Sequence, residues 1–231
     1  MMLDIIRTSA SRPELLKEST ESLLKYIKFS GILRWIIHED VLNWSKSSEC
    51  IEYIKGLDIN KVLLIDKPNV GQGMSLTKLL EASTTKYFLN WEDDYRAERE
   101  IDLDLVVKIL DENNDVNQIS FWKRQTMSEK PGFKKKEVIK SGQVLTTNPH
   151  WAFTPAIWRA SFIKPKWKNG DEIHWHINRV LKASTNNPNA DWVIANLGTY
   201  HLGPIGENRY SYHIGWGDHS LRLGKEQVSW K

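Results

Sequence analysis

Hydrophobic and polar positions follow two different periods along the first part of the chain. Short apolar runs near residues 3–7, 32–37, 61–66 and 86–91 have the length and composition of buried strands. Helices are expected between them, beginning near Ser11–Glu14, around residues 45–55 and around residues 75–82; the first has a serine cap, a proline in its first turn and an apolar face of Leu16, Leu23, Leu24 and Ile27. Strands that alternate with helices in this way predict an α/β fold with a parallel sheet and right-handed crossovers.

The second part of the chain is less regular. A helix is expected over residues 101–110, a strand over 118–123, and a polar, basic loop over 124–141 that includes Lys134–Lys136. Further helices are expected to begin at Thr154–Pro155 and at Gly170, the latter running to about residue 182, with short strands at 191–196 and 199–202. No internal repeat is present, and the length of 231 residues is typical of one domain spanning residues 1–231.

Composition narrows the class of protein. Hydrophobic residues make up 40% and charged residues 26% of the chain, with a net charge of only +3, so no strong field for polyanions follows. The chain has one cysteine, Cys50, and no apolar run near the roughly 20 residues that span a bilayer, so a cytoplasmic protein without a membrane span is expected. The 11 tryptophans suggest either an aromatic core or a stacking surface for sugars or bases. The aromatic residues that cluster late are Trp151, Trp158, Trp167, Trp175, Trp192, Tyr200, Tyr210, Tyr212 and Trp216.

Polar side chains follow three of the predicted strands. They are Arg7–Ser9, Glu39–Asp40 and, after an apolar run rich in aromatic residues, Glu92–Asp94. In an open parallel sheet, ligands bind outside the carboxyl ends of the strands, so these groups should face one cleft. An acidic triplet can be a solvated turn, but its carboxylates are also the hard oxygen ligands that suit Mg²⁺ or Mn²⁺, which could in turn hold a diphosphate.

The order and spacing of several segments resemble the GT-A glycosyltransferases, most like family 2. The resemblance is close over residues 3–95 and loose beyond, and it rests on Thr8, Arg12–Pro13, residues 36–40, Asn69–Gly71 and residues 86–94. It implies a single-domain, Rossmann-like GT-A fold with a mostly parallel sheet flanked by helices. Residues 1–95 would form the nucleotide-binding half, and residues 96–231 an irregular acceptor half with a C-terminal tail.

The resemblance also implies roles for individual residues. Nucleotide contacts are expected from Thr8, Ser9, Arg12, Glu39, Asp40, Gly71, Glu92 and Asp93. The metal, Mn²⁺ or Mg²⁺, is expected on Asp94 with Glu92, where the family more often reads Asp-x-Asp. After Gly73 the family often has Arg-Asn, whereas this chain has Ser75, Thr77 and Lys78.

Glycosyl transfer needs a group that removes the proton of the acceptor hydroxyl. The family places an acid at a helix start in the second half, which matches Asp171 as first choice and Glu172 as second, although acids there can simply cap the helix. His201 resembles the late histidine that completes the metal shell in many GT-A enzymes, but a lone histidine is more often a surface or core residue. In the tail, Arg209 and His213 could close over the diphosphate.

The resulting expectation is a metal-dependent, inverting glycosyltransferase that moves a sugar, with UDP-sugars favoured, to an acceptor hydroxyl. A polysaccharide, a protein or a modified nucleic acid could be the acceptor, the last as in viral enzymes that decorate hydroxymethylated DNA. Two other classes of protein fit the sequence less well. Nucleotidyltransferases would show a glycine-rich motif after the first strand, and residues 7–12 lack the glycines. A non-enzymatic nucleic-acid binding module would use tryptophan stacking and lysine contacts, but the acidic triplet would repel the phosphates of the nucleic acid.

Overall fold

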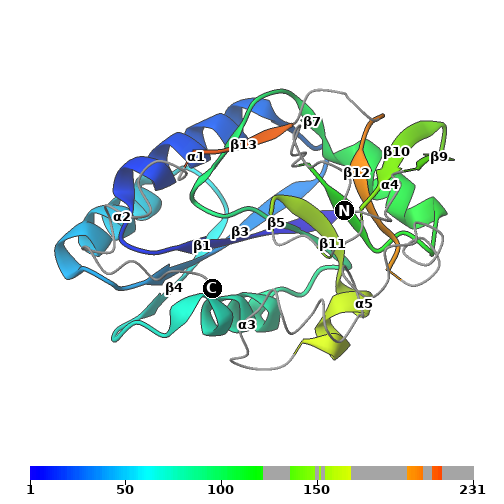
Figure 1. The fold of residues 1–231 in the computed structure, drawn as a ribbon. Helices are drawn as coiled ribbons and strands as arrows, with labels where there is room; N and C mark the ends of the chain where they lie inside the picture. Colours follow the sequence, from blue (N-terminus) through cyan, green and yellow to red (C-terminus); the bar gives the residue numbers. More distant parts are fainter. Residues whose placement is uncertain (122–135, 149–150, 152–153, 168–196, 205–209, 215–231) are drawn as a thin grey trace, which may run out of the picture.

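A nine-stranded sheet forms the centre of the computed structural model, which describes residues 1–121, 136–148, 151, 154–167, 197–204 and 210–214 (Figure 1). The elements in chain order are β1 (Met2–Ser9), α1 (Pro13–Tyr26), β2 (Ile27–Lys28), β3 (Ile32–Asp40), α2 (Trp44–Gly56), β4 (Lys61–Asp66), α3 (Gly71–Ala82), β5 (Tyr87–Asn90), β6 (Tyr95–Ala97), β7 (Ile101–Asp102), α4 (Leu103–Glu112), β8 (Gln118–Ser120), β9 (Glu137–Lys140), β10 (Gln143–Thr147), β11 (Ala156–Arg159), α5 (Ala160–Ile163), the 3-10 helix η1 (Lys164–Lys166), β12 (Thr199–Leu202) and β13 (Ser211–His213). The sheet order is β4-β3-β1-β5-β11-β8-β12-β10-β9. Among the described helices, none is long and apolar enough to cross a membrane.

The first four strands of the sheet are parallel, as the sequence predicts. β1 pairs with β3 on one side and β5 on the other, and β4 pairs with the outer side of β3. Successive side chains enter two cores: Ile5 and Trp35 pack on the side of α1, α2 and α4, and Ile6 and Ile36 pack on the side of α3. This confirms the predicted α/β fold with helices on both faces (Figure 1). The carboxyl ends of β1, β3 and β5 therefore lie at one edge.

The second half of the sheet is mixed, and two predictions there were wrong. The helix expected from Thr154–Pro155 is instead the strand β11, antiparallel to both β5 and β8, with all four residues buried. Its burial between two strands overrides local propensity, and only Ala160–Ile163 turns into a helix. The loop expected up to residue 141 ends in the strands β9 and β10, a hairpin that turns at Ser141 and Gly142 with φ of 50° and 75°.

The late aromatic residues that the structure describes belong mainly to the core. Trp151, Trp158 and Tyr200 are at most 1% exposed. The Trp151 ring packs against Trp158 at 5.4 Å and stacks on Phe162 at 5.3 Å between centroids. Of the two readings of these tryptophans, the structure supports the aromatic core; Trp175, Trp192 and Trp216 lie outside the described residues.

Candidate functional site

A cavity of about 430 Å³ lies at the carboxyl ends of β1, β3 and β5. This volume falls in the range of roughly 300–1,000 Å³ typical of small-molecule sites. Its walls come from the β1–α1 loop, the β3–α2 loop, the start of α3 and the acidic loop after β5. The residues predicted from the sequence that line it are Thr8, Ser9, Arg12, Asp40, Gly71, Glu92 and Asp94.

Asp40 closes the turn that leads into α3. One of its carboxylate oxygens accepts the N–H of Val70 and the other the N–H of Gly71, both at 2.8 Å. Gly71 has a φ of +81°, a conformation that glycine adopts without strain. The carboxylate therefore fixes the wall of the cavity in addition to lining it.

Glu39 lies behind the cavity and does not line it. Its side chain is fully buried, and Oε1 accepts the Ser11 N–H at 2.8 Å and the Ser47 hydroxyl at 2.5 Å. Ser11 has a φ of +56°, unusual for a residue other than glycine, and its hydroxyl accepts the N–H groups of Leu42 and Asn43. Glu39 thus supports the loops of the site, whereas the sequence predicted a direct contact with the nucleotide.

The acidic loop after β5 is held by an arginine from the start of α1. Arg12 donates to both oxygens of Asp93, from Nε at 3.0 Å and from Nη2, and its Nη1 donates to Asp94 Oδ2 at 3.0 Å. Asp93 is 0% exposed and does not line the cavity, whereas Glu92 and Asp94 do. The structure therefore separates the three acids into one internal residue and two that line the cavity.

A second, fully buried arginine lies behind this loop. The guanidinium of Arg7 donates to the hydroxyls of Thr20 and Ser19 at 2.8 and 2.7 Å, and it lies 5.5 Å from the centroid of Trp35. Burial lowers the pKa of Arg7 to about 10, against the opposing attraction of Asp93, so the group stays charged at neutral pH. The negative charge of the loop is thus partly balanced from inside the protein.

His213 reaches the acidic loop from a strand far away in the sequence. β13 pairs antiparallel with β6, which directly follows the acids, and His213 lies opposite Tyr95 in this pairing. His213 Nε2 is 3.4 Å from Asp94 Oδ2, and the imidazole packs edge-on against the Tyr95 ring. Burial opposes charge on Asp94, but the hydrogen bond from His213 and the charge of Arg12 lower its pKa to about 2.

The structure does not bring His201 to these acids. His201 lies in β12, which is three strands from β5 in the sheet, a distance of roughly 14 Å at the usual strand spacing. The sequence predicted His201 as a metal ligand, whereas it predicted that His213 would close over the diphosphate. The pairing of β13 with β6 is non-local, and no pattern within either segment reveals it. Arg209, Asp171 and Glu172 lie outside the described residues.

The residues around Asp94 fit a divalent cation that is shared with a bound diphosphate. Asp94 Oδ1 is buried and accepts no hydrogen bond from any described residue, and Glu92 lines the same cavity. Burial, then the charge of Asp94, raises the pKa of Glu92, as expected for acids that share a site. Within the described ranges, three or more metal-binding side chains nowhere form a ready-made cluster. Mg²⁺ is commonly bound by one or two carboxylates together with substrate phosphates, and an imidazole nitrogen also suits Mn²⁺.

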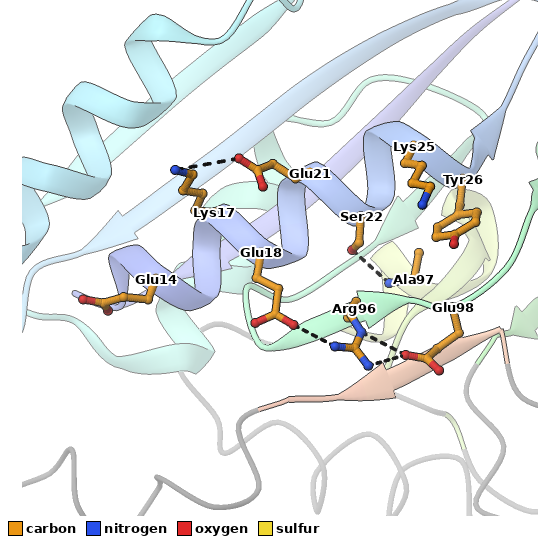
Figure 2. Close-up of a pocket in the computed structure, with 10 residues that line it drawn as sticks. All are labelled: Glu14, Lys17, Glu18, Glu21, Ser22, Lys25, Tyr26, Arg96, Ala97 and Glu98. Atoms are coloured by element: carbon orange, nitrogen blue, oxygen red, sulfur yellow. Dashed lines mark hydrogen bonds and ion pairs between the residues drawn. The ribbon is translucent and has the colours of Figure 1, made fainter.

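A larger groove of about 670 Å³ runs along the outer face of α1, and its charges are mostly paired (Figure 2). Arg96 bridges Glu18 and Glu98 at 2.9 and 2.7 Å, and Lys17 lies 4.0 Å from Glu21. These side chains are between 31% and 61% exposed, so water screens them. The smaller cavity, with its buried acids, is therefore the candidate site.

Comparison with known proteins identifies the fold. The sequence matches no known family and no curated protein. The structure is similar to the mannosyltransferase PcManGT from Pyrobaculum calidifontis in complex with GDP-Man and Mn²⁺ (TM-score 0.59, 12% identity, 88% of this chain and 55% of that one). It is also similar to S. aureus TarS 1-349 in complex with UDP (0.61, 14%, 92% and 60%) and with UDP-GlcNAc (0.58, 14%, 92% and 58%). The chain spans little more than half the length of these proteins, and it has their fold, the GT-A fold of nucleotide-sugar glycosyltransferases.

Proposed function

We propose that this chain is a metal-dependent glycosyltransferase that moves a sugar from a nucleotide diphosphate to an acceptor hydroxyl, with inversion at the anomeric carbon. The observation that carries the proposal is the buried Asp94 Oδ1, which accepts no hydrogen bond from the residues that the structure describes and belongs to a residue lining a cavity at three parallel strand ends. A buried carboxylate oxygen without a donor is costly unless a cation or a ligand group completes it. The GT-A fold supplies the class of ligand.

UDP-sugars are the first donor class to test, and GDP-sugars the second. The similar structures were solved with UDP, UDP-GlcNAc and GDP-Man. The cavity here lies at the carboxyl ends of parallel strands, where open α/β sheets bind their ligands. Thr8 and Ser9 at the end of β1, and Asp40 at the end of β3, would face the nucleoside. Gly71 at the start of α3 lies beside them.

Asp94, with Glu92 and His213, would hold the divalent cation. A divalent cation bound there would stabilise the leaving diphosphate as a Lewis acid. Asp94 is only 6% exposed and His213 Nε2 lies 3.4 Å from its Oδ2, so a cation held there would be shielded from bulk water. His201, which the sequence predicts as a metal ligand, is the matched control residue for His213.

Asp171 remains our proposed base for the acceptor hydroxyl, with Glu172 as the second choice. A carboxylate within hydrogen-bond reach of the attacking hydroxyl takes its proton as the bond to the anomeric carbon forms. The acceptor is a polysaccharide, a protein or a modified nucleic acid. Among the described tryptophans, Trp44 is 52% exposed, but Trp35, Trp91, Trp151 and Trp158 are buried and cannot stack on bases, which disfavours a nucleic-acid binding module built on tryptophan stacking.

The proposal is tested by incubating the protein with a panel of UDP- and GDP-sugars and measuring released UDP or GDP. Release from one donor that requires Mn²⁺ or Mg²⁺ and stops with EDTA is expected, even without acceptor, since water can replace a hydroxyl slowly. The anomeric configuration of the product, read by NMR, tests inversion. Asp171→Asn should slow release without weakening nucleotide binding. Failure to bind or consume any donor would contradict the proposal.

A further inference from the structure

Arg12 forms different hydrogen bonds with the two neighbouring aspartates. Toward Asp93 it forms a fork, with Nε and Nη2 on separate carboxylate oxygens. Toward Asp94 it makes one contact, from Nη1 to Oδ2 at 3.0 Å. A bidentate arginine–carboxylate pair is stronger and more directional than a single hydrogen bond. The guanidinium is therefore fixed by Asp93 and only touches Asp94.

Asp93 is buried in the protein interior and held by hydrogen bonds. Its side chain is completely buried, its N–H donates to the Thr8 carbonyl at 3.3 Å, and its charge lies near the buried Arg7. Burial disfavours the charged form of Arg12, but the attraction of Asp93, and then that of Asp94, outweighs this effect and raises the pKa of Arg12. Arg12 is thus charged beside the acids at neutral pH.

The carboxylate of Asp94 is less completely hydrogen-bonded than that of Asp93. Oδ1 is buried and has no hydrogen-bond donor within the described part of the chain, and Oδ2 faces both Arg12 and His213. Arg12 is 20% exposed and lines the cavity together with Asp94. A guanidinium also carries N–H groups beyond those used on the two aspartates. One positive side chain therefore occupies Asp94 Oδ2, next to the oxygen that a cation would complete, and also lines the cavity in which phosphates would bind.

We propose that Arg12 is a positioning residue that acts as the internal counter-ion of the metal site. This inference rests on the proposed function. Without ligands, Arg12 neutralises Asp94 and disfavours a divalent cation that arrives alone. When cation and diphosphate occupy the cavity together, Arg12 keeps its fork on Asp93, releases Asp94 and directs its N–H groups to the phosphate oxygens. Arg12 thereby makes cation and nucleotide bind as a unit.

This role predicts changes of opposite sign, which a merely structural arginine would not produce. Arg12→Gln removes the charge, so Mn²⁺ without nucleotide should bind tighter, by about 5-fold, in the range of measured coupling between sites. The same variant should bind nucleotide diphosphate more weakly, by about 10-fold, because phosphate contacts are lost. Arg12→Lys keeps the charge but not the fork, so Mn²⁺ alone should bind as in the wild type while nucleotide binding weakens.

The experiment measures free Mn²⁺ by EPR and UDP or GDP affinity by calorimetry, each with and without the other ligand. Arg96→Gln, in the groove along α1, is the matched control and should change neither affinity. Parallel losses of both affinities in Arg12→Gln would overturn the inference, as would unchanged Mn²⁺ binding. If Arg12→Gln does not fold, Arg12→Lys decides: wild-type Mn²⁺ affinity with weakened nucleotide binding supports the role, and equal losses refute it. A wild-type protein that binds neither ligand would instead overturn the proposed function.

Discussion

Two arginine–aspartate pairs lie at opposite ends of strand β1, and they differ in how completely they are satisfied. Near the amino end, Asp4 accepts hydrogen bonds from Arg34 Nε and Nη2 at 2.8 and 2.9 Å. It also accepts the Ser83 hydroxyl and the N–H groups of Thr84 and Thr85. Every oxygen of this buried carboxylate has donors from the protein itself.

At the carboxyl end, the pair of Arg12 with the acidic loop is incomplete. Both oxygens of Asp93 accept hydrogen bonds from Arg12, but Asp94 lines the cavity with one buried oxygen that has no donor among the described residues. Protein interiors rarely leave such an atom unpaired unless a water, an ion or a ligand completes it. The comparison teaches that the amino end of β1 is organised for stability and the carboxyl end for a ligand.

Asp94→Asn should produce the largest effect, on activity. Removing this carboxylate from the cavity should lower turnover about 100- to 1,000-fold, because the proposed charge stabilisation of the leaving diphosphate, several kcal/mol, would be lost. The melting temperature should change by no more than about 3 °C, since Arg12 keeps Asp93. Asp111→Asn, which changes a half-exposed aspartate paired with Lys86, is the control and should leave turnover intact. Unimpaired turnover in Asp94→Asn would place Asp94 with Asp4 as a structural residue.

Asp4→Asn should have the reverse profile. The loss of charge weakens several hydrogen bonds to a buried group, so the free energy of unfolding should fall by about 3 kcal/mol. Urea denaturation measures this loss, and calorimetry on the folded fraction should show unchanged nucleotide affinity. Reduced affinity in fully folded Asp4→Asn would mean that the two ends of β1 are not independent.

His213→Gln should raise the Mn²⁺ concentration needed for half-maximal nucleotide release by about 10-fold, the usual effect of removing a supporting group at a metal site. His201→Gln is the matched variant, and it should leave the Mn²⁺ requirement unchanged because β12 is remote from the acids. A metal titration of both variants distinguishes them. The opposite ranking would restore His201 as the ligand predicted from the sequence.

The pH dependence of stability should separate the wild type from Asp4→Asn. Burial disfavours the charged form of Asp4, but Arg34 and the neighbouring donors outweigh it and lower its pKa below 3.8. A lowered folded-state pKa contributes stability above the unfolded pKa and loses it as the pH falls through the folded value. The difference in unfolding free energy between the two proteins should therefore be full at about pH 6 and smaller at about pH 3. A constant difference would show that charge is not what Asp4 contributes.

Arg96→Gln should have the smallest effect. Its partners Glu18 and Glu98 are 45% and 31% exposed, so the ion pairs along α1 are screened by water. The free energy of unfolding should change by less than about 1 kcal/mol, and nucleotide release should not change. A large loss of turnover would instead draw the groove of Figure 2 into the site.

The parallel half of the fold could be predicted because its signals are local. Short apolar runs followed by polar groups predicted β1, β3, β4 and β5, and the topology of a parallel sheet then placed their ends together. The antiparallel half could not be predicted in this way. Residues 156–159 become a strand only because β5 and β8 flank them, a contact that no local pattern encodes.

The same distinction applies to the site. Residue types at strand ends predicted that Asp94 and Glu92 face a ligand, but not that Arg12 would separate Asp93 from them. Which histidine meets Asp94 depends on the pairing of β13 with β6, more than a hundred residues apart in the sequence. Glu39 and Asp40 are neighbours in a strand, so their side chains point to opposite faces and take different roles.

The most direct test of this account is thermal unfolding of the wild type and Asp94→Asn with UDP or GDP, each with and without Mn²⁺. A nucleotide at about 100 times its dissociation constant should stabilise the wild type by roughly 2.7 kcal/mol. The account predicts a clear shift of the wild type that requires both one nucleotide and Mn²⁺, and little or no shift of Asp94→Asn. Equal shifts of both proteins, or no shift of the wild type with any pair, would contradict it.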